Sequence, residues 1–281
     1  MKYLVFVLLA FFVLFFSLLS KSNSINILYD QPKFSFINSK DFYETYYNDR
    51  NTVIVDLRDY HKYRKNHVDK AISFDVNNLF ETYLGVPRKI KRVEGLIYTF
   101  QDAGIGTFNN VVVYSDKVED SMVFASLLFI FKPRGIFIIK DGYEGWVKNG
   151  LPVSKKISYV ERGYFSPKIS KTLYDSVVWD LNKVLEKMNN YLFVGVSTEK
   201  ISLIPKSILI KPKFDFDRYV VGSYYNSLDI SREKNIILYG VDNYEVLQAY
   251  FVLKIYLNYP NVVVFNGGLN EWVLNNLPVN Q

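Results

Sequence analysis

The feature of this 281-residue sequence that most constrains its fold is a pattern of segments that occurs twice. The segment NNVVVYSD at 109–116 is echoed by KNIILYGVD at 234–242, and DGYEGWVKNGLPV at 141–153 is echoed by NGGLNEWVLNNLPV at 266–279. Between the paired segments, each copy contains a long apolar stretch typical of a helix and then an apolar run typical of a strand. A strand, a helix and a second strand in this order are the building unit of a parallel sheet.

The sequence therefore predicts an α/β fold with two domains, each a parallel β-sheet flanked by helices. Continuous β-branched runs at 53–55 and 111–113 are typical of strands that are covered on both faces. We expect the first domain at 30–155, a linker at 156–171 that contains a glycine and a proline, and the second domain at 172–281. The upstream strands of the two copies match more loosely than the downstream ones, so the second domain is the more degenerate.

The N-terminus indicates export. Lys2 precedes an apolar run from Tyr3 to Leu19, and the polar sequence SKSNS follows it. These features predict that residues 1–22 form a signal peptide or an uncleaved anchor, since a spanning helix needs about 17–25 apolar residues. We expect a periplasmic or other extracytoplasmic protein, either secreted or anchored in the membrane through residues 3–19.

Composition excludes several classes of chemistry. The chain has no cysteine, which removes disulfides, thiolate nucleophiles, iron–sulfur clusters and cysteine-ligated zinc. It has only two histidines, His61 and His67, so a histidine-rich metal centre is excluded as well. A formal net charge of +6 is mild, and it gives little support for nucleic-acid binding. We expect no metal, no cofactor and no nucleic-acid partner.

Several short motifs, in their order along the chain, resemble the tandem form of the rhodanese (thiosulfate sulfurtransferase) family. In the first domain the family's opening pattern is matched within VDLRDYHKYRKNHVDKAI by Asp56, Arg58, Tyr63, His67 and Ala71. The closing pattern of both domains is matched by Asp141, Gly142 and Trp146 and by Gly267, Gly268 and Trp272. The resemblance implies two rhodanese-like domains that cover nearly all of the chain after its N-terminal segment.

The sequence departs from the family where the resemblance implies catalysis. Active rhodaneses carry a cysteine directly after the strand that corresponds to 111–114, and its thiolate accepts the transferred sulfur. The corresponding positions in this chain are Ser115 and Gly240. The loop that begins at each of these positions has an excess of acidic over basic side chains, whereas the resemblance implies a basic residue that attracts an anionic substrate.

The remaining polar residues each have two interpretations. Ser115 could act as a nucleophile with His67 as its base, but a hydroxyl is a poor sulfur acceptor, and we expect His67 to be structural. Asp56 and Arg58 could form an acid and an anion clamp, and we favour hydrogen bonding to local backbone instead. We expect His61 to be a solvated side chain in a charged loop. The basic run PRKIKR at 87–92 could contact anionic lipid, but we favour a solvated loop.

The leading hypothesis is thus an exported, catalytically inactive tandem rhodanese that acts as a binding or scaffold module for a protein partner of unknown identity. The alternative is an enzyme of the sulfurtransferase family whose mechanism uses a residue other than cysteine or a thiol from a partner. A third hypothesis is an adaptor at the membrane surface, in which residues 3–19 are retained and residues 87–92 contact lipid.

Overall fold

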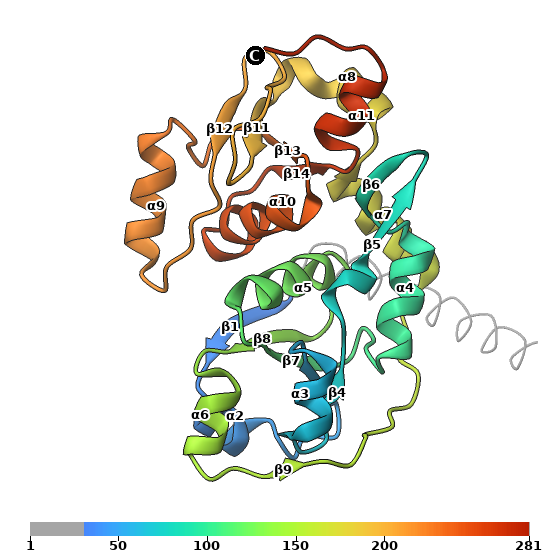
Figure 1. The fold of residues 1–281 in the computed structure, drawn as a ribbon, viewed down its shortest axis with the longest axis vertical. Helices are drawn as coiled ribbons and strands as arrows, with labels where there is room; N and C mark the ends of the chain where they lie inside the picture. The colour runs from blue at the N-terminus through green and yellow to red at the C-terminus, as the bar shows by residue number, and fades with distance from the viewer. Residues whose placement is uncertain (1–30, 281) are drawn as a thin grey trace, which may run out of the picture.

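A computed structural model of the protein describes residues 31–280, and within that range the fold is α/β with two parallel sheets (Figure 1). The first sheet has the strand order β1 (Lys33–Ile37), β8 (Gly135–Ile139), β7 (Asn110–Tyr114), β2 (Thr52–Asp56), β4 (Ile72–Ser73). The second has the order β10 (Val178–Trp179), β14 (Val262–Phe265), β13 (Ile236–Gly240), β11 (Leu192–Val196), β12 (Ile208–Ile210). All neighbouring strands within each of these sheets are parallel. The fold class expected from the sequence is confirmed.

Helices cover both faces of each sheet. The first domain contains α2 (Ser39–Thr45), α3 (Tyr60–Lys65), α4 (Val93–Asp102), α5 (Val118–Ile130) and α6 (Gly142–Lys148). The second contains α7 (Pro167–Val177), α8 (Leu181–Lys187), α9 (Arg218–Ser227), α10 (Asn243–Tyr250) and α11 (Gly268–Leu274). Alternate residues of β2 and β7 pack on opposite faces, as a strand that is buried on both sides requires.

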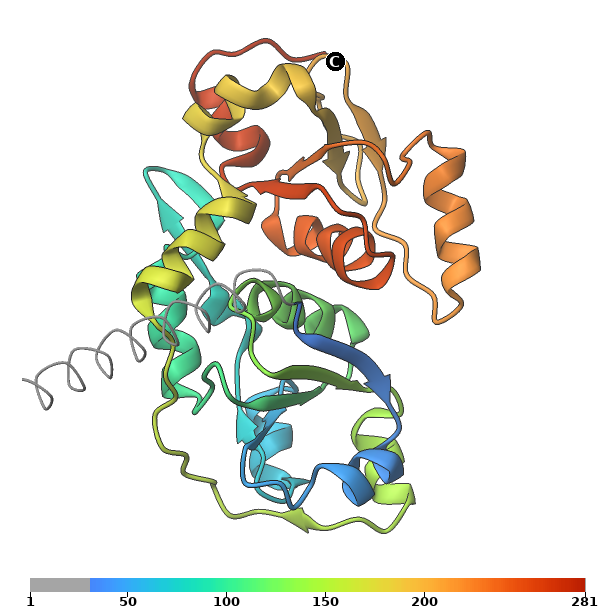
Figure 2. The same cartoon turned by 180° about the vertical axis from the view of Figure 1, so that it is seen from behind.

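The two domains share one continuous apolar core, which runs across the boundary between the sheets. Helices α5 and α10 lie against each other in the middle of this core (Figures 1 and 2). Every residue of α5 from Ser121 to Ile130 is buried, as expected for a helix that is apolar on all sides. The Ser126 hydroxyl donates a buried hydrogen bond of 2.9 Å to the Leu247 carbonyl of α10. The last turns of α10 continue as a π-helix, η3 (Phe251–Tyr256).

A β-hairpin extends from the first domain onto the second, formed by β5 (Phe80–Tyr83) and β6 (Val86–Ile90) (Figure 1). Its two-residue turn consists of Leu84 and Gly85, which both have positive φ, as a type I′ hairpin turn requires. A 3₁₀ turn, η1 (Val76–Leu79), leads into the hairpin. The other minor elements are the antiparallel pair β3 (His67–Val68) and β9 (Val153–Ser154) and the 3₁₀ turn η2 (Met188–Asn190).

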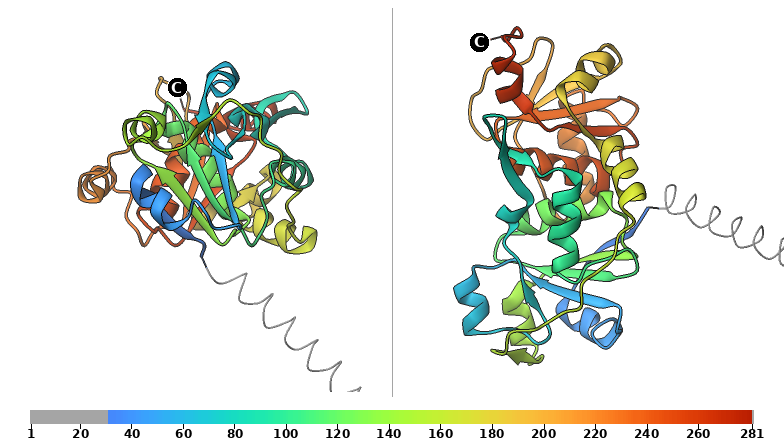
Figure 3. Two further views of the ribbon diagram at one scale, coloured as in Figure 1. Left: turned by 90° about the horizontal axis from the view of Figure 1, so that it is seen from below. Right: turned by 90° about the vertical axis from the view of Figure 1, so that its right-hand side faces the viewer.

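The segment at 155–166, between β9 and α7, has no helix or strand, and it runs along one side of the molecule (Figure 3). The segment packs closely on the first domain. A Cβ added to Gly163 would lie only 2.0 Å from the Ile105 carbonyl oxygen, and Phe165 is buried. The linker that we expected at 156–171 thus includes the first residues of α7. The helix begins at Pro167 because proline is favoured at the first helical position.

The expected signal peptide or anchor at 1–22 lies outside the described residues. Within 31–280, no helix is both long enough and apolar enough to cross a membrane.

Candidate functional site

The loop between β7 and α5 holds Ser115, at the carboxyl edge of the first sheet. The hydroxyl of Ser115 donates to the Lys117 carbonyl at 2.5 Å and lies 2.7 Å from the Ser121 hydroxyl. The side chain therefore closes the loop onto the first turn of α5. Next to it, Asp116 forms an exposed ion pair of 2.6 Å with Lys62 of α3.

His67 has no nitrogen available to act as a base toward Ser115. It is fully buried, with Nδ1 2.7 Å from the Tyr63 carbonyl and Nε2 3.1 Å from the Lys156 carbonyl. Carbonyl oxygens only accept hydrogen bonds, so both ring nitrogens face acceptors. The ring also stacks on Tyr63 at 3.9 Å, and the Tyr63 hydroxyl donates to the Ala71 carbonyl. His67, Tyr63 and Ala71 thus form one buried network that ties α3, β3 and the start of the linker together.

Asp56 and Arg58 form a buried ion pair at the end of β2. Arg58 Nη2 lies 2.7 Å from Asp56 Oδ2, and Arg58 also donates to the Asn66 carbonyl at 2.8 Å. The Tyr114 hydroxyl donates to Asp56 at 2.6 Å and accepts from the Val68 amide. Burial acts to lower the pKa of the Arg58 guanidinium, but Asp56 outweighs it and the pKa is raised. Burial, reinforced by Asp56, raises the pKa of Tyr114.

The closing motifs of the two domains have the same local geometry. Gly142 and Gly268 both begin a helix with positive φ, at +55° and +54°. A Cβ added to Gly142 would lie 3.4 Å from the carbonyl oxygen of Ser115, and one added to Gly268 only 2.2 Å from that of Gly240. Each glycine thus lets its helix approach the loop that follows the preceding central strand.

The two motif tryptophans and Asp141 are also engaged in hydrogen bonds. Trp146 and Trp272 are buried and donate their indole N–H at 2.8 Å to the carbonyls of Pro152 and Pro278. The Asp141 carboxylate accepts from the amide and the hydroxyl of Ser39 at the start of α2. Gly267 lies under the Glu271 side chain, since a Cβ at Gly267 would be 1.6 Å from Glu271 Oε2.

Gly240, the second candidate position, has no room for a side chain. An added Cβ would lie 2.7 Å from the Val196 carbonyl oxygen and 2.9 Å from Val246 Cγ2. The Val196 backbone of β11 and the Val246 side chain of α10 thus occupy the space that a side chain at position 240 would need.

The β5–β6 hairpin of the first domain covers the carboxyl edge of the second sheet. Lys89 Nζ lies 3.2 Å from Glu271 Oε1, and Arg88 Nε lies 3.2 Å from Asp242 Oδ1. The Ile90 backbone exchanges two hydrogen bonds with the Asn266 side-chain amide, at 2.7 and 3.0 Å.

Our expectation of a solvated loop at 87–92 is therefore wrong for Arg88 and Lys89. Lys89 is buried, and only a third of the Arg88 side chain is exposed. The partners of both lie more than 150 residues away in the sequence, so the local pattern could not reveal them. His61, in contrast, is exposed, although it lies on α3 and not in a loop.

A pocket of about 550 Å³ lies between the loops of the two domains. Its walls carry four aspartates and three cations, namely Asp59, Asp75, Asp120, Asp242, Arg58, Arg88 and Lys117. Three of these aspartates cap helices, since Asp59, Asp75 and Asp242 accept backbone N–H bonds at the starts of α3, η1 and α10. A carboxylate at a helix start takes the place that an anionic ligand would need.

The fourth aspartate joins the first turns of the two helices that follow the candidate positions. The Tyr244 hydroxyl of α10 donates to Asp120 Oδ1 of α5 at 2.7 Å. Burial raises the pKa of the Asp120 carboxyl, and the hydrogen bond from Tyr244 partly opposes this effect. Burial and the neighbouring Asp120 also raise the pKa of Tyr244.

Comparison with known proteins agrees with this geometry. The family model of the rhodanese-like domain matches residues 39–149. A putative thiosulfate sulfurtransferase of Synechococcus elongatus is 24% identical over 223 residues, which cover 69% of this chain and 68% of that protein.

Solved structures share the fold. The anaerobic ergothioneine biosynthesis enzyme from Chlorobium limicola, in complex with trimethyl histidine, superposes with a TM-score of 0.67 at 15% identity, over 88% of this chain and 70% of that one. The wild-type structure of EanB gives the same TM-score and identity, over 88% and 69% of the two chains.

Residues 39–149 therefore match a rhodanese-like domain, and the chain is similar to a putative thiosulfate sulfurtransferase but contains no cysteine. Within residues 31–280, no group of three or more histidine, aspartate or glutamate side chains is arranged to hold a metal ion.

Proposed function

We propose that this protein is a catalytically inactive tandem rhodanese that is exported and acts by binding a protein partner. The observation that carries the proposal is the chemistry of the two positions where the family places its cysteine. A sulfur carrier needs a soft nucleophile that ionises easily, and the chain offers a hydroxyl at Ser115 and no side chain at Gly240.

The two halves of the chain have corresponding architectures, and this supports the proposal of a tandem protein. Both sheets have corresponding strand orders, and the tyrosine of each central strand uses its hydroxyl in the same way. Tyr114 accepts from the Val68 amide at 3.1 Å, and Tyr239 accepts from the Ile204 amide at 3.0 Å. In this correspondence Ser115 and Gly240 occupy equivalent places.

Exposed aromatic side chains offer a surface for a protein partner. Tyr159 and Tyr164 of the linker are 94% and 64% exposed, and Tyr98 and Phe108 near them in the first domain are 58% and 74% exposed. The Tyr164 carbonyl accepts from the Thr107 amide, which places the linker beside the loop that carries Phe108. Tyrosine and phenylalanine are enriched at protein interfaces, because they bury much area with few rotatable bonds.

The alternative, an enzyme that uses a residue other than cysteine, receives less support from the geometry. The Ser115 hydroxyl is engaged with Lys117 and Ser121, and both nitrogens of His67 face carbonyl oxygens. A serine nucleophile requires a base that can take its proton, and Ser115 has no such neighbour among its hydrogen-bond partners in the described chain.

The decisive experiment is an assay of sulfur transfer from thiosulfate to cyanide with the purified full-length protein. We expect no thiocyanate above the level of a boiled sample, and clear turnover would refute inactivity.

Binding is tested separately by crosslinking in the native envelope, where Tyr159→Ser with Tyr164→Ser should reduce the crosslinked species. Sequencing of the native N-terminus tests export and shows whether residues 1–22 are retained.

A further inference from the structure

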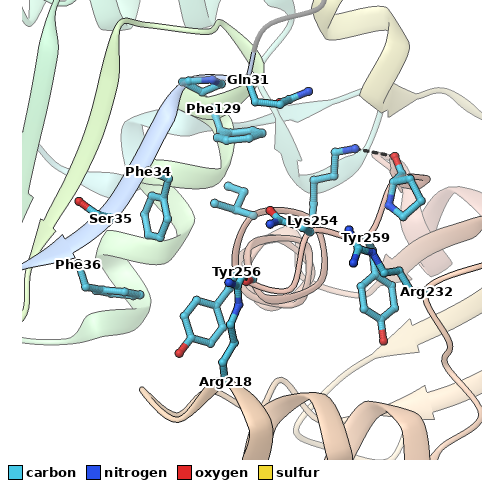
Figure 4. A pocket seen from close by; sticks show the side chains of 14 residues that line it. Gln31, Phe34, Ser35, Phe36, Phe129, Arg218, Arg232, Lys254, Tyr256 and Tyr259 are labelled. Carbon is cyan, nitrogen blue, oxygen red and sulfur yellow. Dashed lines mark hydrogen bonds between the residues drawn. The ribbon is translucent and has the colours of Figure 1, made fainter.

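A second pocket lies between the two domains, on the side of β1. It has a volume of about 640 Å³, within the range of about 300–1,000 Å³ that is typical of small-molecule sites. Figure 4 shows its walls, formed by β1 and α5 of the first domain and, in the second, by η3, the start of α9 and the loops that precede β13 and β14. None of these elements belongs to the loops at Ser115 and Gly240.

The charged side chains on its walls are all cations. Arg218, Arg232 and Lys254 line the pocket, and the described wall residues include no aspartate or glutamate. None of the three forms an ion pair within residues 31–280. The nearby Asp217 carboxylate is turned toward the backbone amides of α9, which it caps.

These cations keep donors available for a ligand. Lys254 Nζ donates to the Pro260 carbonyl at 2.6 Å, and Arg218 donates one N–H to the Tyr256 carbonyl. An ammonium has three donors and a guanidinium five, so most of them remain free. Backbone carbonyls thus hold Lys254 and Arg218 in place without neutralising their charge.

Lys254 is the most informative of the three, because it lies on the π-helix η3 and is half-buried without a counter-charge. Burial lowers the pKa of its ammonium, because a partly buried charge is less well solvated than one in water. An anion bound beside it would offset that cost. Single π-helical turns within α-helices often mark functional sites, and Lys254, Ile255 and Tyr256 of η3 all line the pocket.

The opposite wall is aromatic and preformed. Phe34 and Phe36 of β1 are half-buried, and each packs edge-to-face on Phe251 of η3, with ring centroids 5.2 and 6.1 Å apart. Phe34 and Phe36 therefore offer flat carbon surface to the pocket. On the side of the cations, the hydroxyls of Tyr256 and Tyr259 are engaged with the carbonyls of Phe216 and Ile230 (Figure 4).

We propose that this pocket binds an organic phosphate, with its phosphate oxygens on Arg218, Arg232 and Lys254 and its carbon part against Phe34 and Phe36. Arginine matches phosphate with paired N–H donors, and lysine adds a point charge. The phosphate is that of a soluble phosphomonoester or of a phospholipid headgroup. The proposal of this phosphate site does not depend on whether the protein binds a partner or transfers sulfur.

The test uses the full-length protein and phenyl phosphate, whose ring and phosphate match the two walls. Binding is measured by titration calorimetry for the wild type, for Arg232→Gln with Lys254→Gln, and for the control pair Arg64→Gln with Lys65→Gln on α3. We expect the pocket variant to lose about tenfold or more in affinity and the control to bind like the wild type. Circular dichroism and thermal unfolding establish that both variants are folded.

Vesicles of phosphatidylcholine with and without phosphatidylglycerol form the second arm. Extra binding to the anionic vesicles that is lost in the pocket variant, without binding of phenyl phosphate, assigns the site to a lipid headgroup. Binding of phenyl phosphate alone assigns it to a soluble ligand, and binding of both supports the shared phosphate chemistry. The proposal is overturned if neither probe binds the wild type more tightly than the pocket variant.

Discussion

Lys89 of the first domain and Glu271 of the second form an ion pair of 3.2 Å, with 10% and 18% of their side chains exposed. The pair lies where the β5–β6 hairpin covers the carboxyl edge of the second sheet. Glu271 Oε2 is buried there without a hydrogen-bond partner among the described residues, so the carboxylate depends on Lys89 for its charge compensation.

We expect Lys89→Met to lower the free energy of unfolding by roughly 1–3 kcal/mol, because it leaves the Glu271 carboxylate buried and uncompensated. Urea unfolding measures the change. Lys65→Met removes an exposed lysine of α3 and should stay within about 0.5 kcal/mol of the wild type. Equal effects of the two substitutions would contradict the role of the hairpin as a contact between the domains.

The Asp56–Arg58 pair should be far more sensitive to the loss of one partner than the exposed pair of Lys62 and Asp116. Asp56→Ala leaves a buried guanidinium without its anion, and we expect a loss of about 3–5 kcal/mol. Lys62→Ala should cost less than about 1 kcal/mol. Replacing both residues, as in Asp56→Leu with Arg58→Met, should be milder than Asp56→Ala alone. An additive loss in the double variant would show that the pair is not coupled.

The two positions that lack the family cysteine should respond differently when one is introduced. Gly240→Cys should destabilise the protein by about 1–3 kcal/mol, because its Cβ would contact the Val196 carbonyl and Val246. Ser115→Cys keeps the size of the side chain and should fold. Thermal unfolding of the two variants compares them directly, and a Gly240→Cys protein as stable as the wild type would contradict the geometry.

The acidic side chains near residue 115 should limit sulfur uptake by a Ser115→Cys protein. Asp116 and Glu119 flank the position and repel thiosulfate, so adding Glu119→Gln should raise the rate a few-fold at low salt. Mass spectrometry after incubation with thiosulfate measures the gain of one sulfur atom. A rate that does not change with Glu119→Gln or with salt would remove the electrostatic explanation.

Asp120 should make stability depend on pH. The folded protein holds the Asp120 proton more tightly than the unfolded chain, since burial raises the carboxyl pKa above its ordinary value of 3.8. The free energy of unfolding therefore falls as the pH rises from the ordinary value to the raised one. Asp120→Asn lacks this titration, so its stability relative to the wild type should increase over that range and then stay constant.

Tyr244→Phe provides the complementary test in the same urea unfolding series. It removes the hydrogen bond that partly lowers the pKa of Asp120, so the pH-dependent loss of stability should extend to higher pH than in the wild type. If the difference in free energy of unfolding between Asp120→Asn and the wild type does not change with pH, the pKa of the Asp120 carboxyl is not raised.

The sheets could be predicted from the sequence because their signals are local. Runs such as 111–113 and 236–238 are continuous and β-branched or aliphatic, and each is followed by an apolar stretch of helical length. The end of each central strand then locates Ser115 and Gly240. For Asp56 and Arg58 we expected hydrogen bonds to local backbone. Arg58 does donate to the Asn66 carbonyl, but the ion pair between the two residues was not predicted.

Contacts between the domains could not be predicted in this way, because they depend on how two separate sheets dock. The hairpin sequence contains a proline and several cations, which usually indicate a solvated loop, and its partners Asn266 and Glu271 follow only from docking. One signal was present: Leu84 and Gly85 stand between two short segments of strand-forming residues. The π-helix has no sequence signature that periodicity detects.

The apolar core that α5 and α10 share has a consequence for the history of this chain. A protease cut or a premature stop codon between the two sheets would yield fragments that expose a large hydrophobic surface. Such fragments would aggregate instead of working as separate modules. Neither half can therefore be discarded by itself, and the two must be made, folded and degraded together.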